Sequence, residues 1–120
     1  WAATSFFGTA DVPQLTNQDD LSIFTMLTCL NGKFVETTDS LGETLLNRNG
    51  GGAVAVWASS GETTPDIQEI MARRFYGQLG SNPSMVRLGD LVKDAKSVLT
   101  GGRDVKLSWV ILGDPMLKVK

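Results

Sequence analysis

A chain of 120 residues, 42% of them hydrophobic, can enclose one modest core and no more. Its 11 basic and 13 acidic side chains give a net charge of -2, which argues against a nucleic-acid partner, because phosphate binding requires a basic surface. The longest apolar runs, residues 21–27 and 53–58, are far shorter than the roughly 20 residues needed to cross a bilayer, so no membrane-spanning segment is expected.

The single cysteine, Cys29, excludes an internal disulfide, so the fold has to be stabilised by packing. The chain starts at Trp1, without an initiator methionine or an apolar leader, and this start favours a processed or truncated piece of a longer protein. The missing signal segment therefore carries no information about the compartment. No internal repeat or linker divides the sequence, and we expect a single domain over residues 1–120.

The first half of the chain combines turn, strand and helix signals. Thr9 is a suitable cap for a short helical turn, and Ser40 with Glu43 forms a capping box for a later helix. The first apolar run is rich in β-formers and is typical of a buried parallel strand rather than an edge strand. The predicted elements are a helical turn over residues 9–15, a strand over 21–28, a helix over 41–47 and a buried strand over 53–58.

The second half predicts two amphipathic helices followed by strands. Pro65 suits the first position of a helix, and apolar residues then recur every three or four positions in both helical segments. Gly101 and Gly102 end the second of them. The predicted elements are helices over residues 66–79 and 87–99, a strand over 105–112 and a short edge strand over 116–119.

Strands separated by helices predict an α/β fold with a mostly parallel sheet and helices on both of its faces. Crossovers of one hand place the loops that follow parallel strands at the same end of a sheet. Cys29 follows the first predicted strand, and the polar loop over residues 59–64 follows the second. We therefore expect Cys29 and this loop to face one crevice.

Cys29 has two readings when it is judged from its own sequence context. A lone cysteine after an apolar strand is commonly a small buried core residue. Cys29 also stands at a strand-to-loop junction, where α/β sheets place ligands, and Asn31-Gly32 follows it closely. A catalytic thiol needs an activating partner, usually an imidazole, and this chain contains no histidine. It cannot form a Cys-His pair by itself.

Three other features invite a chemical role, each beside a structural explanation. The glycines at 50–52 follow a helix and precede a strand, the reverse of a phosphate loop, so a helix cap and turn is favoured. Asp114 suits a metal ligand or catalytic acid, or an aspartate that bonds its own turn. Glu62 suits either recognition of a basic side chain in the crevice or a solvated loop. No spacing resembles a metal or haem site, and no cofactor is expected.

Four segments together resemble the gingipain family of caspase-like cysteine peptidases. They are residues 25–34 (TMLTCLNGKF), 40–46 (SLGETLL), 49–60 (NGGGAVAVWASS) and 112–117 (LGDPML). The most specific of them is the Cys-x-Asn-Gly segment at the end of a strand. Each motif is short, but their common order over nearly the whole chain makes the resemblance much stronger than any one of them.

The resemblance implies the C-terminal part of a caspase-like three-layer sandwich, in which Cys29 is the nucleophile and its backbone N–H helps to form the oxyanion hole. The family's general base is a histidine in a His-Gly motif on the preceding strand. In similar proteins a Trp-Ala-like segment follows that motif, and Trp1-Ala2 matches it. The histidine is therefore expected upstream of this chain, and the chain alone is expected to be inactive.

The family also suggests a specificity pocket and a set of partners. The loop over 59–64 matches the wall of the primary specificity pocket, which implies a pocket role for Ser59, Ser60, Gly61 and Glu62. The best-known members cleave after arginine or lysine, but the acidic residue that sets this preference lies upstream. Implied partners are a protein or peptide substrate and the N-terminal remainder of the domain. The resemblance implies a secreted or cell-surface bacterial protein.

Two function classes stay open at this stage. One is a cysteine endopeptidase whose nucleophile lies in this chain. The other is a non-catalytic α/β module that binds a protein partner at the same crevice, and the missing histidine motivates it. A flavodoxin-like domain is a distant third, because no phosphate-binding loop is visible. In either main case a sheet cut beside a strand leaves an open edge, so we expect association with the N-terminal part or with a second copy.

Overall fold

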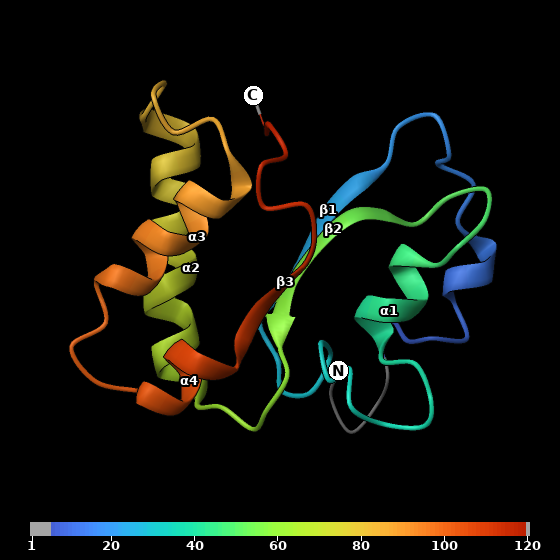
Figure 1. Cartoon of the computed structure of the whole chain (residues 1–120), viewed down its shortest axis with the longest axis horizontal. Coiled ribbons are helices and arrows are strands. Elements are labelled where there is room, and N and C mark those ends of the chain that lie inside the picture. Colours follow the sequence, from blue (N-terminus) through green and yellow to red (C-terminus); the bar gives the residue numbers. More distant parts are fainter. Residues whose placement is uncertain (1–5, 120) are drawn as a thin grey trace.

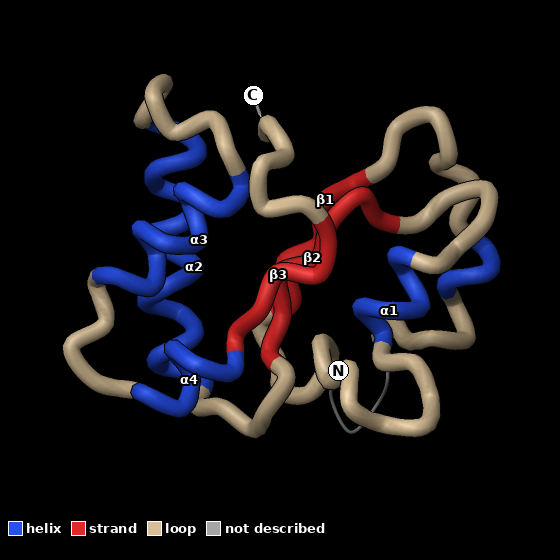
Figure 2. The backbone as a smooth tube through the Cα atoms, in the orientation of Figure 1, coloured by secondary structure: helices blue, strands red, loops and turns tan. Residues whose placement is uncertain are grey.

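The computed structural model describes residues 6–119 and builds them around one sheet (Figure 1). Its strands are β1 (Ser22–Met26), β2 (Ala53–Ser59) and β3 (Trp109–Gly113), in the spatial order β1-β2-β3 (Figure 2). β1 runs parallel to β2, as expected, but β3 runs antiparallel to it. The described sheet is therefore mixed, and the expectation of a mostly parallel sheet does not hold for these residues.

The path of the helices explains the antiparallel strand. α2 (Pro65–Ser81) leads away from the end of β2, and α3 (Leu88–Ser97) leads back toward it (Figure 1). α4 (Arg103–Ser108) then places the chain beside the end of β2, where the Ser60 N–H donates to the Ser108 carbonyl over 2.8 Å. Two long helices bring the chain back to the end of the sheet that it left, so β3 has to run against β2.

The last part of the chain corrects two predictions. The segment 105–112 was expected to be a strand, but its first residues belong to α4 and only Trp109 onward is extended. Val105 and Trp109 lie four positions apart and are both buried, so a helical turn is the conformation that directs both into the core. Residues 116–119 form no strand; one isolated bridge joins Arg87 to Lys118.

The helix predictions hold with small shifts of their ends. α1 (Leu41–Leu46) begins with the predicted capping box, in which the Glu43 N–H donates to Ser40 Oγ over 3.3 Å and the Ser40 N–H donates to Glu43 Oε2 over 2.8 Å. Pro65 occupies the first position of α2. The predicted turn near the start is the 3-10 helix η1 (Val12–Gln14), whose N-cap is Asp11 rather than Thr9.

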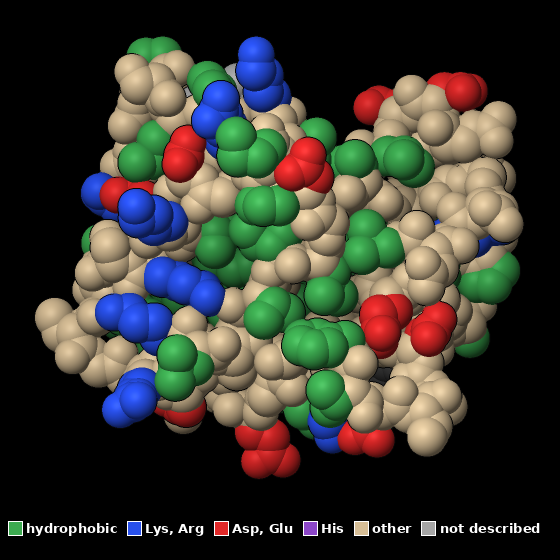
Figure 3. Space-filling view, in the orientation of Figure 1, with side chains coloured by type: hydrophobic (Ala, Val, Ile, Leu, Met, Phe, Trp, Pro, Cys, Tyr) green, Lys and Arg blue, Asp and Glu red, His purple; other side chains and the backbone are tan. Residues whose placement is uncertain are grey.

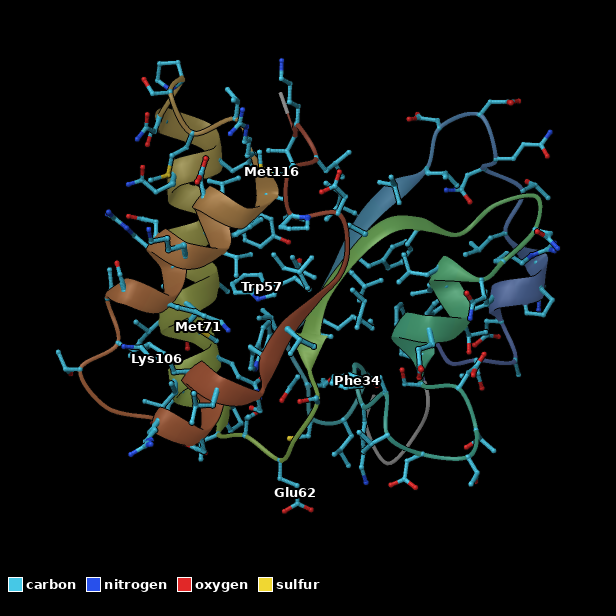
Figure 4. The ribbon with its side chains drawn as sticks, in the orientation of Figure 1. Phe34, Trp57, Glu62, Met71, Lys106 and Met116 are labelled. Carbon is cyan, nitrogen blue, oxygen red and sulfur yellow. The ribbon has the colours of Figure 1, made fainter. Side chains whose placement is uncertain are left out.

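β2 is the centre of the core, and its two faces pack against different helices. Ala55 and Trp57 face α2 and α3, whereas Val56 and Ala58 face α1 and η1. Trp57 is fully buried, with its ring centroid 4.9 Å from that of Phe75 and 4.9 Å from that of Trp109. Figure 4 shows Trp57 and Met71 in the layer between the sheet and α2. Helices therefore cover both faces of this sheet.

β1 lies at an edge of the described sheet and is only half-buried, so the expectation of a buried strand fails there. Large apolar side chains remain exposed beside it and elsewhere; Leu21 is 40% exposed and Leu27 is 41% exposed. Figure 3 shows further apolar side chains across the middle of one face, with lysines and arginines gathered over the helices on its left side. This much exposed apolar surface is typical of an interface.

Candidate functional site

Cys29 lies in the loop that follows β1 and is exposed. The reading of this cysteine as a buried core residue is therefore wrong. Two backbone hydrogen bonds join its loop to the end of β2 and the residues after it. The Leu30 N–H donates to the Gly61 carbonyl over 3.3 Å, and the Gly32 N–H donates to the Ser59 carbonyl over 2.9 Å. These bonds continue the pairing of β1 with β2 beyond the strands. They fix the loop on which the thiol stands.

The residues after Cys29 show why a Cys-x-Asn-Gly sequence suits this loop. Leu30 has a φ of 66°, in the left-handed region, so the chain turns sharply just after the cysteine. Gly32 passes so close to β2 that a Cβ there would lie 3.2 Å from the Cβ of Ala58. A larger residue at this position would push the loop away from the sheet.

Asn31 connects the same loop to helix α1. Its carbonyl accepts a 2.8 Å hydrogen bond from the Gly42 N–H, and its side-chain amide donates to the hydroxyl of Thr28. A Cβ on Gly42 would lie 3.0 Å from the Asn31 carbonyl oxygen, so a small residue is needed where α1 docks. The capping box of α1 and the position of Cys29 are thus parts of one local arrangement.

The sulfur of Cys29 contacts Thr63 in the opposite loop. The thiol donates to the Thr63 carbonyl over 3.2 Å, and the Thr63 N–H donates to the sulfur over 3.3 Å. The Thr63 hydroxyl oxygen lies 3.8 Å from the sulfur. The expected juxtaposition of Cys29 with the loop after β2 is therefore present.

A cleft of about 380 Å³ opens beside the thiol. It borders the first turn of α2, where the positive end of the helix dipole favours an anion, although Asp66 in the same turn carries a negative charge. Gln68 is 2% exposed, and its side-chain amide donates to the Thr63 hydroxyl. The lining residues are Leu27, Thr28, Cys29, Asn31, Thr63, Pro65 and Gln68.

The four residues predicted for the substrate pocket lie near this cleft but do not line it. Ser59 is fully buried, and its hydroxyl donates to the Gly61 carbonyl over 2.8 Å. Ser60 donates from its hydroxyl to the Ser108 carbonyl over 2.8 Å. Glu62 is exposed and points away from the body of the molecule (Figure 4). A pocket role for these residues stays a prediction.

Sequence reasoning assigned no role to Thr63 or Gln68, although Thr63 lies inside the predicted loop. A threonine before Thr64-Pro65 is an ordinary helix-start signal, and a glutamine in the first turn of a helix is ordinarily exposed. The only sequence signal was their place after the second strand. The contact of Thr63 with the thiol, and that of Gln68 with Thr63, depend on how α2 leaves β2.

The remaining candidates have structural roles. Gly52 has a φ of +101°, and its N–H donates to the Asn17 side chain over 2.8 Å, so the glycine tract is the predicted helix end and turn. The Asp114 carboxylate accepts from the Met116 N–H over 2.8 Å, which is the predicted turn contact. The Trp1-Ala2 match lies outside the described residues.

Among the described residues two basic side chains have shifted pKa values, and neither lines the cleft. Partial burial lowers the pKa of Lys96, whose ammonium donates to the Trp109 carbonyl. A hydrogen bond with Asp94 raises the pKa of Arg74. Within residues 6–119 no cluster of acidic residues and cysteine is suited to a metal ion, and no helix is long and apolar enough to cross a membrane.

Comparison with known proteins places this geometry in a family. The family model described as peptidase family C25 matches residues 1–120. The chain belongs to peptidase family C25. The gingipain-type resemblance inferred from the four segments is thereby confirmed.

Among curated relatives, the chain is 27% identical to gingipain R2 of Porphyromonas gingivalis strain W83, over 98% of this chain and 18% of that protein. It is also 27% identical to gingipain R1 of Porphyromonas gingivalis, over 98% of this chain and 13% of that protein. The chain thus spans less than a fifth of either relative.

Solved structures share the fold of this chain. The crystal structure of the Arg-specific cysteine proteinase gingipain R (RgpB) matches with a TM-score of 0.80 and 25% identity, over 99% of this chain and 30% of that one. The complex of the RgpB pro- and mature domains matches with a TM-score of 0.90 and 24% identity, over 99% of this chain and 31% of that one. The α/β fold of the chain is therefore that of gingipain R, of the caspase-like kind.

Proposed function

We propose that this C25 chain carries the nucleophile of a cysteine endopeptidase, and that Cys29 attacks a protein or peptide substrate. The observation that carries the proposal is the exposed thiol at the edge of a cleft, on a loop held by both β2 and α1. Thiol nucleophiles have to be accessible and held in place. A structural cysteine of the core would not be accessible to a substrate.

The reaction needs a thiol, a general base and a hydrogen-bond donor to the oxyanion around the scissile carbonyl. The thiol proton passes to a general base, and the sulfur electron pair forms a bond to the carbonyl carbon. The C–N bond then breaks, the amine takes the proton from the base, and a thioester remains. Water then adds to the thioester carbonyl and gives a proton to the base. The C–S bond breaks, the base returns this proton to the sulfur, and the carboxylic acid product leaves.

The Cys29 backbone supports the carbonyl oxygen in this scheme. Within residues 6–119 the Cys29 N–H has no hydrogen-bond acceptor, so it is free to donate to the oxyanion. The left-handed turn at Leu30 separates this N–H from that of Leu30, which donates to the Gly61 carbonyl. One donor is thereby left for substrate while the next one anchors the loop.

These 120 residues contain no histidine, so a histidine base would come from outside them. We propose that the general base is a histidine upstream of this chain, on a strand that pairs with the free edge of β1 in a complete three-layer sandwich. The half-buried β1 and the exposed Leu21 and Leu27 beside it support this arrangement. The N-terminal remainder of the peptidase domain is then the first partner of the chain, and self-association is the second arrangement that would cover this edge.

Labelling of the full-length protein with iodoacetamide tests the proposal. We expect Cys29 to react faster than free cysteine at neutral pH, and we expect a Cys29→Ala variant to lose cleavage of fluorogenic peptides by at least about 10³-fold. Arginyl peptides are the first substrates to test, because the matched gingipain R is Arg-specific. Slow labelling together with no cleavage would overturn the proposal and favour the non-catalytic module.

A further inference from the structure

Thr63 places two backbone groups beside the Cys29 sulfur, and these groups favour opposite protonation states of the sulfur. The Thr63 carbonyl, 3.2 Å away, accepts the S–H proton and so favours the thiol. The Thr63 N–H, 3.3 Å away, donates to the sulfur and so favours the thiolate. The orientation of this one residue therefore influences how easily the nucleophile forms.

The Thr63 hydroxyl is the third group, and Gln68 fixes it. A hydroxyl has one proton to donate and lone pairs to accept with. Because the Gln68 amide donates to the hydroxyl oxygen, the hydroxyl proton remains available, and the sulfur lies 3.8 Å from that oxygen. Gln68 itself is 2% exposed in the first turn of α2, so its own rotamer is held by packing.

We propose that Gln68 is a positioning residue for the nucleophile, holding Thr63 so that its hydroxyl and N–H both point at the Cys29 sulfur. On deprotonation the sulfur loses its donor bond to the Thr63 carbonyl and keeps two incoming donors. The inference rests on the proposed function of Cys29 as a thiolate nucleophile. It adds that this thiolate is supported from within the chain, by groups separate from the general base.

The experiment compares four variants of the full-length protein by the pH dependence of Cys29 alkylation, read by mass spectrometry of the labelled peptide. We expect Thr63→Val to slow alkylation at neutral pH about tenfold and to move the profile to higher pH, because it removes a donor to a charged sulfur. Thr63→Ser, which keeps the hydroxyl, is expected to stay within about twofold of the wild type.

Gln68→Met removes the amide but keeps the volume of the side chain, and is expected to slow alkylation about threefold. The matched control is Gln78→Met on the same helix, where the amide pairs with Asn82 far along α2 from the cleft; its profile is expected to be unchanged. This control separates a loss of helix stability from a loss of positioning. If Thr63→Val fails to fold, the Gln68→Met and Thr63→Ser profiles still decide the inference.

The outcomes separate this inference from the proposed function. A wild-type protein that cleaves peptides, with Thr63→Val and Gln68→Met profiles that match it, would overturn the positioning role and leave the peptidase intact. A wild-type Cys29 that alkylates no faster than free cysteine, in a protein without cleavage, would overturn the proposed function instead. Shifted profiles in both variants, with Thr63→Ser and Gln78→Met unshifted, support the positioning role.

Discussion

The two ends of the β1–β2 pair are built on the same plan but with different atoms. At the amino end, Asn17 bridges to Gly52, donating to its carbonyl over 3.0 Å and accepting from its N–H over 2.8 Å. At the carboxyl end, Cys29 bridges to Thr63 in the same way, over 3.2 Å and 3.3 Å. In each case a side chain before or after β1 bonds both backbone polar groups of a residue in a loop that adjoins β2.

The difference lies in what each bridge leaves free. The Asn17 amide uses separate atoms to donate and to accept, so both partners are satisfied at once. The sulfur of Cys29 does both with one weakly bonding atom, remains exposed, and borders a cleft. The amino end is therefore a closed turn whose value is stability, whereas the carboxyl end keeps a group that can react. Changes at the two ends should affect different measurements.

Gly52→Ala should produce the largest change in stability at the closed end. A Cβ at this position would lie 2.2 Å from the Leu45 carbonyl oxygen, and the φ of +101° is unsuited to other residues. We expect a loss of about 3 kcal/mol in the free energy of unfolding, measured by urea denaturation of the full-length protein.

The control for this variant is Gly77→Ala in α2, where nothing lies within 4 Å of the added Cβ. It is expected to stabilise the protein by up to about 1 kcal/mol, because alanine is the better helix former. Cys29→Ala should leave stability nearly unchanged while removing activity. A Cys29→Ala variant as unstable as Gly52→Ala would break the contrast between the two ends.

Asn17→Ala should have the next largest effect, because it leaves the Gly52 N–H and carbonyl without their side-chain partner. We expect a loss of about 1–2 kcal/mol in the same unfolding measurement, with the alkylation rate of Cys29 unchanged. Gln18→Ala, the exposed neighbour, should change stability by less than about 0.5 kcal/mol. Loss of thiol reactivity in Asn17→Ala would show that the two ends are coupled.

Glu62→Gln should have the smallest effect. It tests whether the reactive carboxyl end extends beyond the cleft to Glu62. Because the carboxylate is exposed and does not line the cleft, we expect kcat/KM for arginyl peptides to change by less than about twofold. Peptides with a neutral residue at the same position serve as the reference. A selective loss of tenfold or more on arginyl peptides would place Glu62 in the specificity pocket after all.

Local signals in the sequence predicted much of this molecule because they act within a few residues. The capping box of Ser40 and Glu43, the helix start at Pro65 and the Asp114 turn each involve neighbours along the chain. The apolar run of β2 was equally clear, because burial on both faces leaves no room for polar residues. The parallel pairing of β1 with β2 followed from the helix between them.

The predictions were wrong where the structure depends on residues that are far apart in the sequence. The direction of β3 was set by the return of α3 and α4 to the end of β2, which no periodicity in residues 105–112 encodes. The half-burial of β1 was set by its edge position, which the apolar run by itself does not show. Both depend on the global path of the chain.

By itself the sequence determined that Cys29 follows a strand, that no histidine of this chain can activate it, and that four segments in order match the gingipain family. Only the tertiary structure decided what meets the thiol. The partner is Thr63, supported by Gln68, and neither was singled out from the sequence. A contact between these two loops depends on the direction in which α2 leaves the sheet. That direction depends on the packing of α2 against Trp57, which lies outside the loops.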